Sequence, residues 1–409
     1  MDKYFENGQY MLNKLTITTN TSSPVELDIH SVMKDMTIYE SIYNNTVSGN
    51  ITIVDSSNTV REFNLGNYEK IKIDYNTAGV ETPTVVNAII YKVSKPFRIS
   101  EHASGHTLYF ASEELFNSIA MKTFTGHEQE ISSIVEELYD RIKRQEETKS
   151  LATSKTKNIE NYLFTGNTVF EAINMVADQA TSLTGENGYV FYEDLEKFNF
   201  TTIEALYQQE PVIEYAYKNS GVFDDAKRTR NEEAFNSYQD FEIMDYNSYS
   251  QNLNDGEFGS AWGNFSIYDK RLDIYNYSVD KNFDADKSLG VKQAPLPNGW
   301  ANNFNNKISL TYTSNFGTKF VPTVDGRMVK LRSSNFIVSI GVFGDSTLRV
   351  GSTCIANIPN WSSNGMQPSG ADRDIYSGKF LIAEIKHVFT QKLYTQRIKI
   401  IKDEYEVPT

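Results

Sequence analysis

The chain has 409 residues, 39% of them hydrophobic and 22% charged, and this balance excludes an intrinsically disordered protein. Its net charge of −14 argues against a surface that grips nucleic acid, because such a surface needs clustered lysines and arginines. The single cysteine, Cys354, excludes an intramolecular disulfide framework and a thiolate zinc cluster, and we expect it to pack as a small apolar side chain.

Two features of the sequence argue against a membrane or secreted protein. The longest apolar run, residues 336–343, is far shorter than the roughly 20 residues that cross a bilayer. The first six residues, Met1 to Glu6, lack the basic and then apolar order of a signal peptide. We therefore expect no membrane insertion, and a protein made and kept in the cytosol or in an assembly that forms there.

The first 112 residues predict β-strands joined by turns, because aromatic and β-branched residues recur there in short runs. The expected strands are 16–19, 36–43, 50–55, 68–75, 86–93 and 107–111. The turn-rich segment 44–49 between the second and third of them predicts a hairpin. From residue 70 to residue 75, charged and apolar residues alternate, so this strand has one buried and one wet face.

Residues 113–210 change character and predict an α+β domain with two helices. Apolar residues from Ile131 to Ile142 fall at helical spacing. The polar segment 144–158 predicts a loop. Thr168 and Glu171 have the spacing of a capping box and predict a helix that carries Ile173, Val176, Ala177 and Ala180 on one face. Short strands over 188–192 and 198–203 complete this domain.

The remaining chain divides into 211–322 and 323–409. Residues 220–320 are rich in Asn, Asp, Tyr and Ser and predict long loops with a few short strands, for example 264–268. After a short helix at 327–333, strands are expected at 335–342, 353–358, 380–389 and 395–401.

The two ends of the chain share an order of elements. At the first end, strand 51–54 is followed by a strand that opens at Leu65-Gly66, then by strands 89–93 and 106–110. At the second end, strand 336–342 is followed by a strand that opens at Val350-Gly351, then by strands 382–388 and 396–401. This repetition suggests two β units of one kind in each chain. Three such chains, if they were arranged around one axis, would present six similar units.

The histidines do not form a recognisable metal site. His102 and His106 have zinc-like spacing, but the segment that contains them reads as a turn between strands. His127-Glu128 begins like a zinc-protease motif and lacks the second histidine.

The acidic residues also fail to define a site. Asp280, Asn282, Asp284 and Asp286 resemble a calcium loop, but Ala285 and Val291 stand where glycine and glutamate are required. Nothing in the sequence fixes a glycosidase pair among the remaining carboxylates, which include Asp224, Asp225, Asp245 and Asp255. We therefore predict no catalytic, metal or cofactor-binding residues, no cofactor, and no enzyme activity.

The sequence resembles a known family, the baseplate central hub proteins of T-even-type contractile-tailed phages, which are related to the hub part of type VI secretion spike proteins. Four collinear stretches carry the resemblance, each of them short: 37–43 with 49–58, 160–163 with the helix after it, 188–194 running on to 209–211, and 379–387. Residues 220–320 do not visibly match.

The resemblance implies a fold and a set of partners. The expected fold is mainly β with an α+β insertion: a first tube-like antiparallel β-barrel over 1–112, the helix-containing domain over 113–210, the start of a second barrel with a loop-rich insertion over 211–322, and the rest of that barrel over 323–409. Such hubs are homotrimers that hold a trimeric cell-puncturing spike at one end and meet the tail tube or its initiator at the other. DNA passes through the ring without specific binding, and the protein resides in the tail baseplate of the virion after assembly in the host cytoplasm.

Two other functions remain open at this point. The Tyr- and Asn-rich middle and the tryptophans Trp262, Trp300 and Trp361, if exposed, would suit a receptor- or glycan-binding tail module. The abundant carboxylates are the only motivation for a glycan hydrolase or a peptidase.

Overall fold

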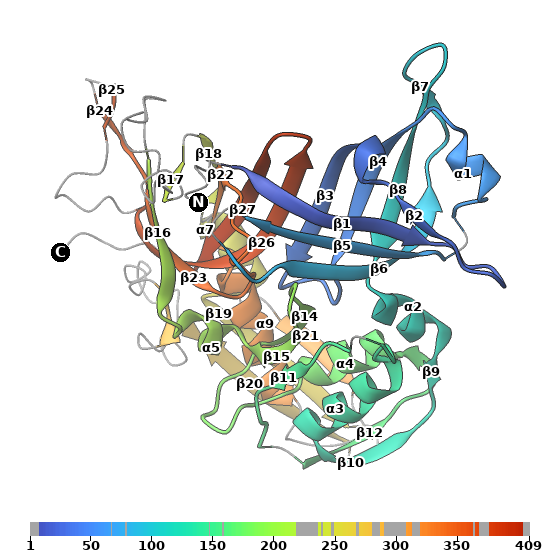
Figure 1. Ribbon diagram of the computed structural model, residues 1–409. Coiled ribbons are helices and arrows are strands. Elements are labelled where there is room, and N and C mark those ends of the chain that lie inside the picture. The colour runs from blue at the N-terminus through green and yellow to red at the C-terminus, as the bar shows by residue number, and fades with distance from the viewer. Residues whose placement is uncertain are drawn as a thin grey trace.

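The computed structural model describes residues 8–66, 68–77, 80–146, 148–157, 159–217, 236–238, 240–246, 249–266, 270–279, 287–289, 308–312, 320–362, 365–367 and 376–403. Most of the elements are strands, and the helices are few and short (Figure 1). Within these ranges, no helix combines the length and the hydropathy that crossing a bilayer requires.

The first module, defined here by strands β1 to β8, is a curled antiparallel sheet whose strands run from blue to teal in Figure 1. Its strands are β1 (Tyr10–Thr18), β2 (Glu26–Asp28), β3 (Met33–Ser41), β4 (Ser48–Asp55), β5 (Lys70–Thr77), β6 (Thr84–Val93), β7 (Phe97–Arg98) and β8 (Ser104–Ala111). They run in the spatial order β3-β4-β8-β6-β5-β1-β2, with the short helices η1 (His30–Val32) and α1 (Thr59–Glu62) in the connections. The predicted hairpin is β3–β4, so that prediction is confirmed.

The alternation of apolar and polar residues along the strands determines which side chains form the core of this module. Ile71, Ile73 and Tyr75 of β5 are at most 1% exposed, and they pack with the inward side chains of β1, β3, β4 and β8. Phe389 and Tyr394, which come from the far end of the chain, belong to the same core. The first module therefore closes its interior only when the C-terminal strands are in place.

The α+β domain lies below the sheet in Figure 1. Its elements are α2 (Glu113–Ala120), β9 (Lys122–Thr123), β10 (Gly126–Glu130), α3 (Ile131–Ile142), β11 (Leu151–Thr153), β12 (Ile159–Leu163), β13 (Asn167–Thr168), α4 (Val169–Ala177), β14 (Tyr189–Glu193), β15 (Phe198–Thr202) and α5 (Ile203–Tyr207).

The two predicted helices of this domain are present. Helix α3 spans the predicted residues, with Ile131, Ile134 and Leu138 fully buried. The capping box at α4 is confirmed, because the Thr168 hydroxyl accepts from the Glu171 backbone N–H and the Glu171 carboxylate accepts from the Thr168 N–H. The prediction of a loop over 144–158 is partly wrong, because β11 within it pairs in parallel with β15. A strand of three residues is too short to give a recognisable sequence pattern.

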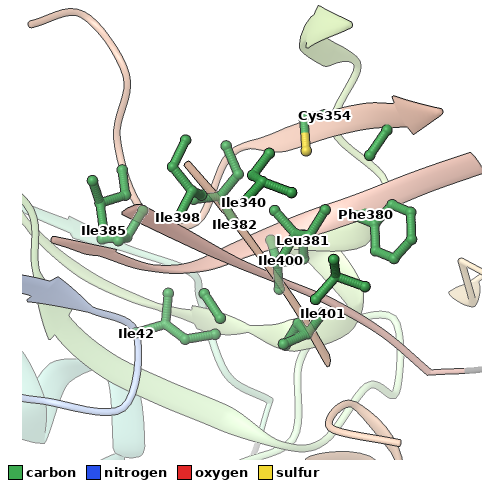
Figure 2. Close-up of a cluster of buried hydrophobic side chains, with 14 of the residues drawn as sticks. Ile42, Ile340, Cys354, Phe380, Leu381, Ile382, Ile385, Ile398, Ile400 and Ile401 are labelled. Carbon is green, nitrogen blue, oxygen red and sulfur yellow. The ribbon is translucent and has the colours of Figure 1, made fainter. Parts of the chain in front are cut away.

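The second module, defined here by strands β16 to β18, β22, β23, β26 and β27, continues the sheet of the first. These strands are β16 (Pro211–Tyr217), β17 (Ser237–Tyr238), β18 (Asp240–Tyr246), β22 (Phe336–Phe343), β23 (Thr353–Asn357), β26 (Gly378–Thr390) and β27 (Tyr394–Lys402). Its core includes Ile340, Cys354, Ile382, Ile398 and Ile400, each of which is completely buried (Figure 2). Cys354 thus packs as a core residue, and burial raises the pKa of its thiol well above the ordinary value.

Residues 220–320 hold more regular structure than the sequence predicted. Besides β18, the described part includes α7 (Tyr249–Asp255), β19 (Gly259–Ser266), β20 (Arg271–Ser278) and β21 (Ile308–Tyr312). The strand predicted at 264–268 overlaps β19, but β19 and β20 pair over eight residues each, so these strands are longer than the prediction of long loops with a few short strands implied. Polar residues such as Asn264 and Asn276 interrupt the apolar residues of these strands, so period-two apolar alternation is weak there.

The remaining elements are α9 (Phe320–Arg332), which begins earlier than the helix predicted at 327–333, and the two-stranded pair β24 (Asn360–Ser362) and β25 (Gly365–Gln367). Helix α9 packs Val324 and Met328 against Trp262 and Tyr277 in a small core of its own.

The two modules repeat one topology. In the first, the strands run in space as β3-β4-β8-β6-β5-β1, and in the second as β18-β22-β27-β26-β23-β16. Ranked by position in the chain, both paths read second, third, sixth, fifth, fourth, first. Each of the first four pairings is antiparallel in both modules; only the last differs, because β16 runs parallel to β23.

Backbone irregularities repeat at matching places as well. A register shift lies between Ile90 and Lys92 in the β6–β8 pair and between Ile382 and Glu384 in the β26–β27 pair. The Ile90 N–H donates to the Glu69 carbonyl, and the Ile382 N–H donates to the Ser352 carbonyl. The predicted fold class, mainly β with an α+β insertion and two similar β units, is confirmed.

Candidate functional site: the seam between the two sheet modules

The two modules join through β26, the longest strand described. Its residues 378–381 pair with β23, and beyond them Glu384 to Thr390 pair with Ser41 to Asp35 of β3 in antiparallel register. Strand β27 occupies the other edge of β26. We call the β26–β3 ladder and the polar side chains around it the seam.

A buried polar network crosses the seam. His387 Nε2 lies 2.6 Å from Glu40 Oε1, and His387 Nδ1 lies 2.7 Å from the Tyr394 hydroxyl. Each of these residues is at most 1% exposed. The second Glu40 oxygen accepts from the Leu195 backbone N–H at 3.0 Å, which ties the α+β domain to the same network.

The residue types of this network resemble those of a catalytic triad, but its environment does not suit catalysis. Burial raises the pKa of the Tyr394 hydroxyl well above its ordinary value, which opposes ionisation near neutral pH. The Tyr394 ring also stacks on Phe389, with 4.2 Å between ring centroids. The arrangement holds three chain segments in one register and offers no surface to a substrate.

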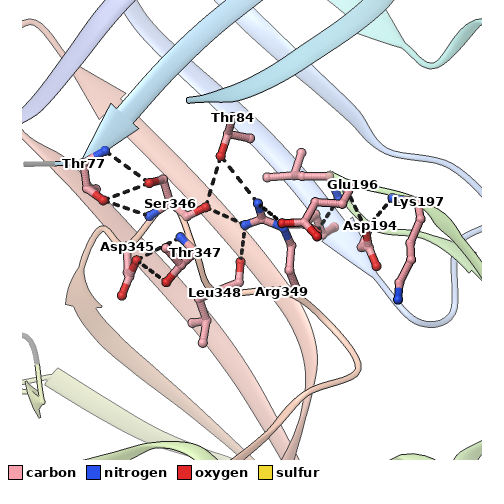
Figure 3. A network of polar contacts seen from close by, with 12 residues as sticks. Thr77, Thr84, Asp194, Glu196, Lys197, Asp345, Ser346, Thr347, Leu348 and Arg349 are labelled. Atoms are coloured by element: carbon pink, nitrogen blue, oxygen red, sulfur yellow. Dashed lines mark hydrogen bonds and ion pairs between the residues drawn. The ribbon is translucent and has the colours of Figure 1, made fainter. Parts of the chain in front are cut away.

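A second network, formed by the loop between β22 and β23, ties both modules to the α+β domain (Figure 3). The Ser346 hydroxyl lies 2.8 Å from that of Thr77, and the Ser346 carbonyl accepts from the Thr84 hydroxyl. Arg349 donates to the Ser346 carbonyl at 2.6 Å and to Glu196 at 2.9 Å. One loop of the second module thereby contacts the ends of β5 and β6 and the turn after β14.

A third network fixes the α+β domain under the first module. Arg144 donates to both oxygens of Glu114 at 2.8 Å, a bidentate geometry that orients both side chains. Glu193 accepts from the Val47 N–H at 2.8 Å and pairs with Lys149 at 2.8 Å. Burial, the largest effect, raises the pKa of Glu193 despite the nearby lysine.

Arg332, the last residue of α9, lies near the carboxyl groups of Glu204, Glu257 and Asp403. Burial raises the pKa of Glu204 to about 7 and that of Glu257 to about 6, and Arg332 opposes both shifts. Asp403 lies 4.0 Å from Arg332 and accepts from the Leu289 N–H. Across the described ranges, no three His, Cys, Asp or Glu side chains gather in a way that would hold a metal ion.

The structure separates the histidines that the sequence singled out. His102 is exposed in the turn before β8, whereas His106 is buried on β8 with its Nε2 3.2 Å from the Ser104 hydroxyl. His127 lies on β10, 2.8 Å from the Thr125 hydroxyl and 3.4 Å from Glu137. The side chains of His106 and His127 therefore each have a local structural partner.

The tryptophan hypothesis fails where the structure describes it. Trp262 is only 5% exposed and donates its indole N–H to Ser260 at 2.8 Å, so the exposure that a glycan platform needs is absent there. Trp361 lies on β24. Trp300, Asp224, Asp225 and the segment Asp280 to Asp286 lie outside the described residues.

A shallow pocket of about 380 Å³ lies on the second module over β22 and β27. Its charged lining residues already have partners: Arg397 donates to Asp240 at 2.7 Å, and Lys386 lies over the Tyr39 ring.

Sequence reasoning missed the seam residues Glu40 and His387 as members of a site. A signal for them existed, because the period-two pattern of β3 puts Glu40 on the same face as Ile38 and Ile42. A charged residue on an apolar face requires a buried partner. The identity of that partner depends on tertiary pairing between residues 347 positions apart.

No model of a known protein family matches the sequence, and no curated protein matches it. Among solved structures, the fold is similar to a tail protein from Neisseria meningitidis MC58, with a TM-score of 0.56, 10% identity, and 96% of this chain and 97% of the other covered. It is similar to the 43 kDa tail protein of prophage MuSo2 from Shewanella oneidensis, with a TM-score of 0.55, 7% identity, and coverage of 96% and 99%.

A third similar structure is a chain of the Francisella PdpA-VgrG complex, with a TM-score of 0.52 and 12% identity. The match covers 98% of this chain and 54% of the other, so this chain spans about half the length of that one. At these identities the comparisons concern the fold alone. The chain has the fold of these tail proteins, and the resemblance to tail proteins that its sequence predicted is confirmed at the level of the fold.

Proposed function

We propose that this chain is a structural, non-enzymatic subunit of a phage-tail baseplate hub. Three copies form a ring that adapts a threefold spike to a sixfold tail tube and continues the channel through which DNA passes. The observation that carries the proposal is the repeated six-strand topology, because two like modules in each of three chains supply six like units around one axis.

The polar chemistry supports a structural role. The most extensive polar networks described, around His387, Arg349 and Glu193, all join segments that are distant in the sequence. Buried networks of this kind set register and domain orientation. The net charge of −14 agrees with a bore along which a polyanion passes without adhering.

The partners follow from the same proposal. A trimeric cell-puncturing spike would bind at one end of the ring, and the tail tube or its initiator would bind at the other. The protein would reside in the tail baseplate of the virion after assembly in the host cytoplasm. The division at residues 112, 210 and 322 into first barrel, α+β domain, insertion and second barrel remains part of this proposal.

The mass of the purified protein in solution tests the trimer. Light scattering over a wide concentration range should give a mass three times that of the 46.5 kDa chain. A mass of one chain at every concentration, with or without the spike, would remove the basis for the ring.

A further inference from the structure

The repeated topology contains a second pair of strand edges that corresponds to the seam. These two edges do not pair with each other within one chain. Within the chain, β3 of the first module pairs with the second half of β26 in the second. In the repeated topology, β18 takes the place of β3 and β6 with β7 takes the place of β26. These two elements lie at opposite ends of the path β18-β22-β27-β26-β3-β4-β8-β6, so they cannot pair within one chain (Figure 1).

The registers determine which residues correspond. In the first module, Thr37, Asn50, Tyr109 and Lys92 lie opposite one another across four strands. In the second module, the same positions are held by Glu242, Ser339, Lys399 and Glu384. Glu242 therefore corresponds to Thr37.

The same counting identifies the counterpart of Val388. Val388 pairs with Thr395, four residues before Lys399 on β27, and Phe97 pairs with Gly105, four residues before Tyr109 on β8. Phe97 therefore corresponds to Val388. Because Val388 lies opposite Thr37 in the seam, Phe97 would lie opposite Glu242 of another copy.

In the part of the chain that the structure describes, the β6–β7 edge is an uncovered strand edge with exposed apolar side chains. Strand β5 covers β6 only as far as the Glu69–Ile90 bond, and within the described ranges no strand covers the same edge farther on. Tyr91, Phe97 and Ile99 are 43%, 41% and 42% exposed along this edge. Three exposed apolar side chains beside open backbone groups make an edge that proteins normally cover.

The β18 edge is complementary in strand geometry and in charge. Among the residues that the structure describes, β18 pairs with β22 on one side only. The side chains of Asp240 and Glu242 remain 67% and 64% exposed, although Arg397 contacts both. The facing segment carries Lys92, Lys95 and Arg98, all exposed. Opposite charges on two edges favour their pairing and disfavour pairing of either edge with itself.

We propose that β18 of one copy adds antiparallel to the β6–β7 edge of the next copy, with Glu242 opposite Phe97, and so repeats the intrachain seam between chains. This inference rests on the proposed function, because it needs a ring of identical chains. The interface is heterologous, and three repeats of it close the ring. Pro96 has no N–H, so this ladder lacks one bond that the β26–β3 ladder can form.

Paired cysteines test the register. Phe97→Cys combined with Glu242→Cys in the full-length chain should give a covalent trimer on a non-reducing denaturing gel after mild oxidation. The native Cys354 is fully buried and does not compete.

Three controls accompany this variant. Each single substitution should remain a monomer on the same gel. Thr37→Cys with Val388→Cys, the equivalent pair inside the chain, should form a disulfide without a change in oligomeric mass. Ile99→Cys with Glu242→Cys uses an equally exposed position two residues out of register, where the Cα atoms are too far apart for a disulfide, and should give little trimer.

The possible outcomes distinguish a failure of the proposed strand pairing from a failure of the proposed hub function. Trimer from Phe97→Cys with Glu242→Cys, and little from the displaced pair, supports the inference. A protein that is trimeric by light scattering but not cross-linked, or equally cross-linked by the displaced pair, overturns the register and leaves the hub function standing. A monomeric protein at all concentrations overturns both.

Discussion

At the scale of single residues, the pair of Glu40 and His387 is the interaction on which the seam depends most. Both side chains are completely removed from water, and each is the other's nearest charged or polar partner, at 2.6 Å. Removal of one member of a buried pair leaves the other without compensation, and this costs far more than loss of a surface pair.

We therefore expect Glu40→Gln to lower the free energy of unfolding by on the order of 3 kcal/mol in urea titrations. Glu384→Gln is the matched control, because Glu384 lies on the same strand ladder and pairs with Lys399 at 2.7 Å with both side chains more than a third exposed. That control should change stability by less than about 1 kcal/mol. Equal effects of the two substitutions would contradict the structural role of the buried pair.

Glu204 makes stability depend on pH. Its folded pKa of about 7 lies above the unfolded value of 4.5, because burial favours the neutral acid. The folded state therefore binds more protons between these two values, and stability falls as the pH rises from 4.5 to 7. The shift corresponds to about 3 kcal/mol.

The predicted result is that Glu204→Gln flattens the decline in unfolding free energy between about pH 4.5 and about pH 7. Glu128→Gln, which removes an exposed carboxylate from β10, is the control and should leave the slope unchanged. A Glu204→Gln protein with the wild-type slope would show that this carboxyl does not carry the dependence.

At the scale of elements, Gly49 of β4 is required by close packing. A Cβ atom at this position would lie 2.3 Å from the Phe110 ring and 2.4 Å from the Thr37 carbonyl. The carbonyl belongs to the neighbouring strand and cannot move without breaking the β3–β4 ladder.

Gly49→Ala should consequently destabilise the protein by about 1–3 kcal/mol or more, measured by thermal or urea unfolding. Gly126→Ala provides the comparison, because a Cβ on that strand residue meets nothing closer than 3.7 Å. If the two variants unfolded alike, the tight contact at β4 would be refuted.

Elements with a strong local signal were predictable from sequence. The apolar spacing of residues 131–142 and the capping box at Thr168 both depend on neighbours within four residues, and both predictions match the structure. Strands β19 and β20 pair with each other over eight residues, and the sequence pattern predicted only the segment 264–268, which overlaps the end of β19. The burial of Trp262 also depends on residues distant in the sequence, since Val324 and Met328 of α9 pack against it.

The repeat was visible in the sequence only approximately. The order of strands was correct, but the dipeptides Leu65-Gly66 and Val350-Gly351 do not correspond in the structure. The register aligns Lys70 with Thr353, so Gly351 matches Tyr68, and both residues have positive φ angles of 82° and 64°. A conserved backbone shape can be carried by glycine in one copy and by a strained tyrosine in the other.

At the scale of the whole molecule, the two modules share one sheet, and their cores exchange side chains at the seam. Phe389 and Tyr394 of the C-terminal strands fill the first module, while Ile42 of the first module fills the second. The modules are therefore held in one fixed relation within the chain. That relation is the geometric basis of the proposed ring. The same rotation and translation, applied between neighbouring chains, would place the first module of one chain beside the second module of the next.

The central claim is that three chains place six like modules around an open bore. An electron cryomicroscopy reconstruction of the purified particle, calculated without imposed symmetry, tests it most directly. The account predicts a ring of three chains in which the rotation between modules of neighbouring chains matches the rotation between the two modules of one chain. A compact single chain without a bore, or a ring whose chains meet through surfaces unrelated to β18 and β6–β7, would contradict it.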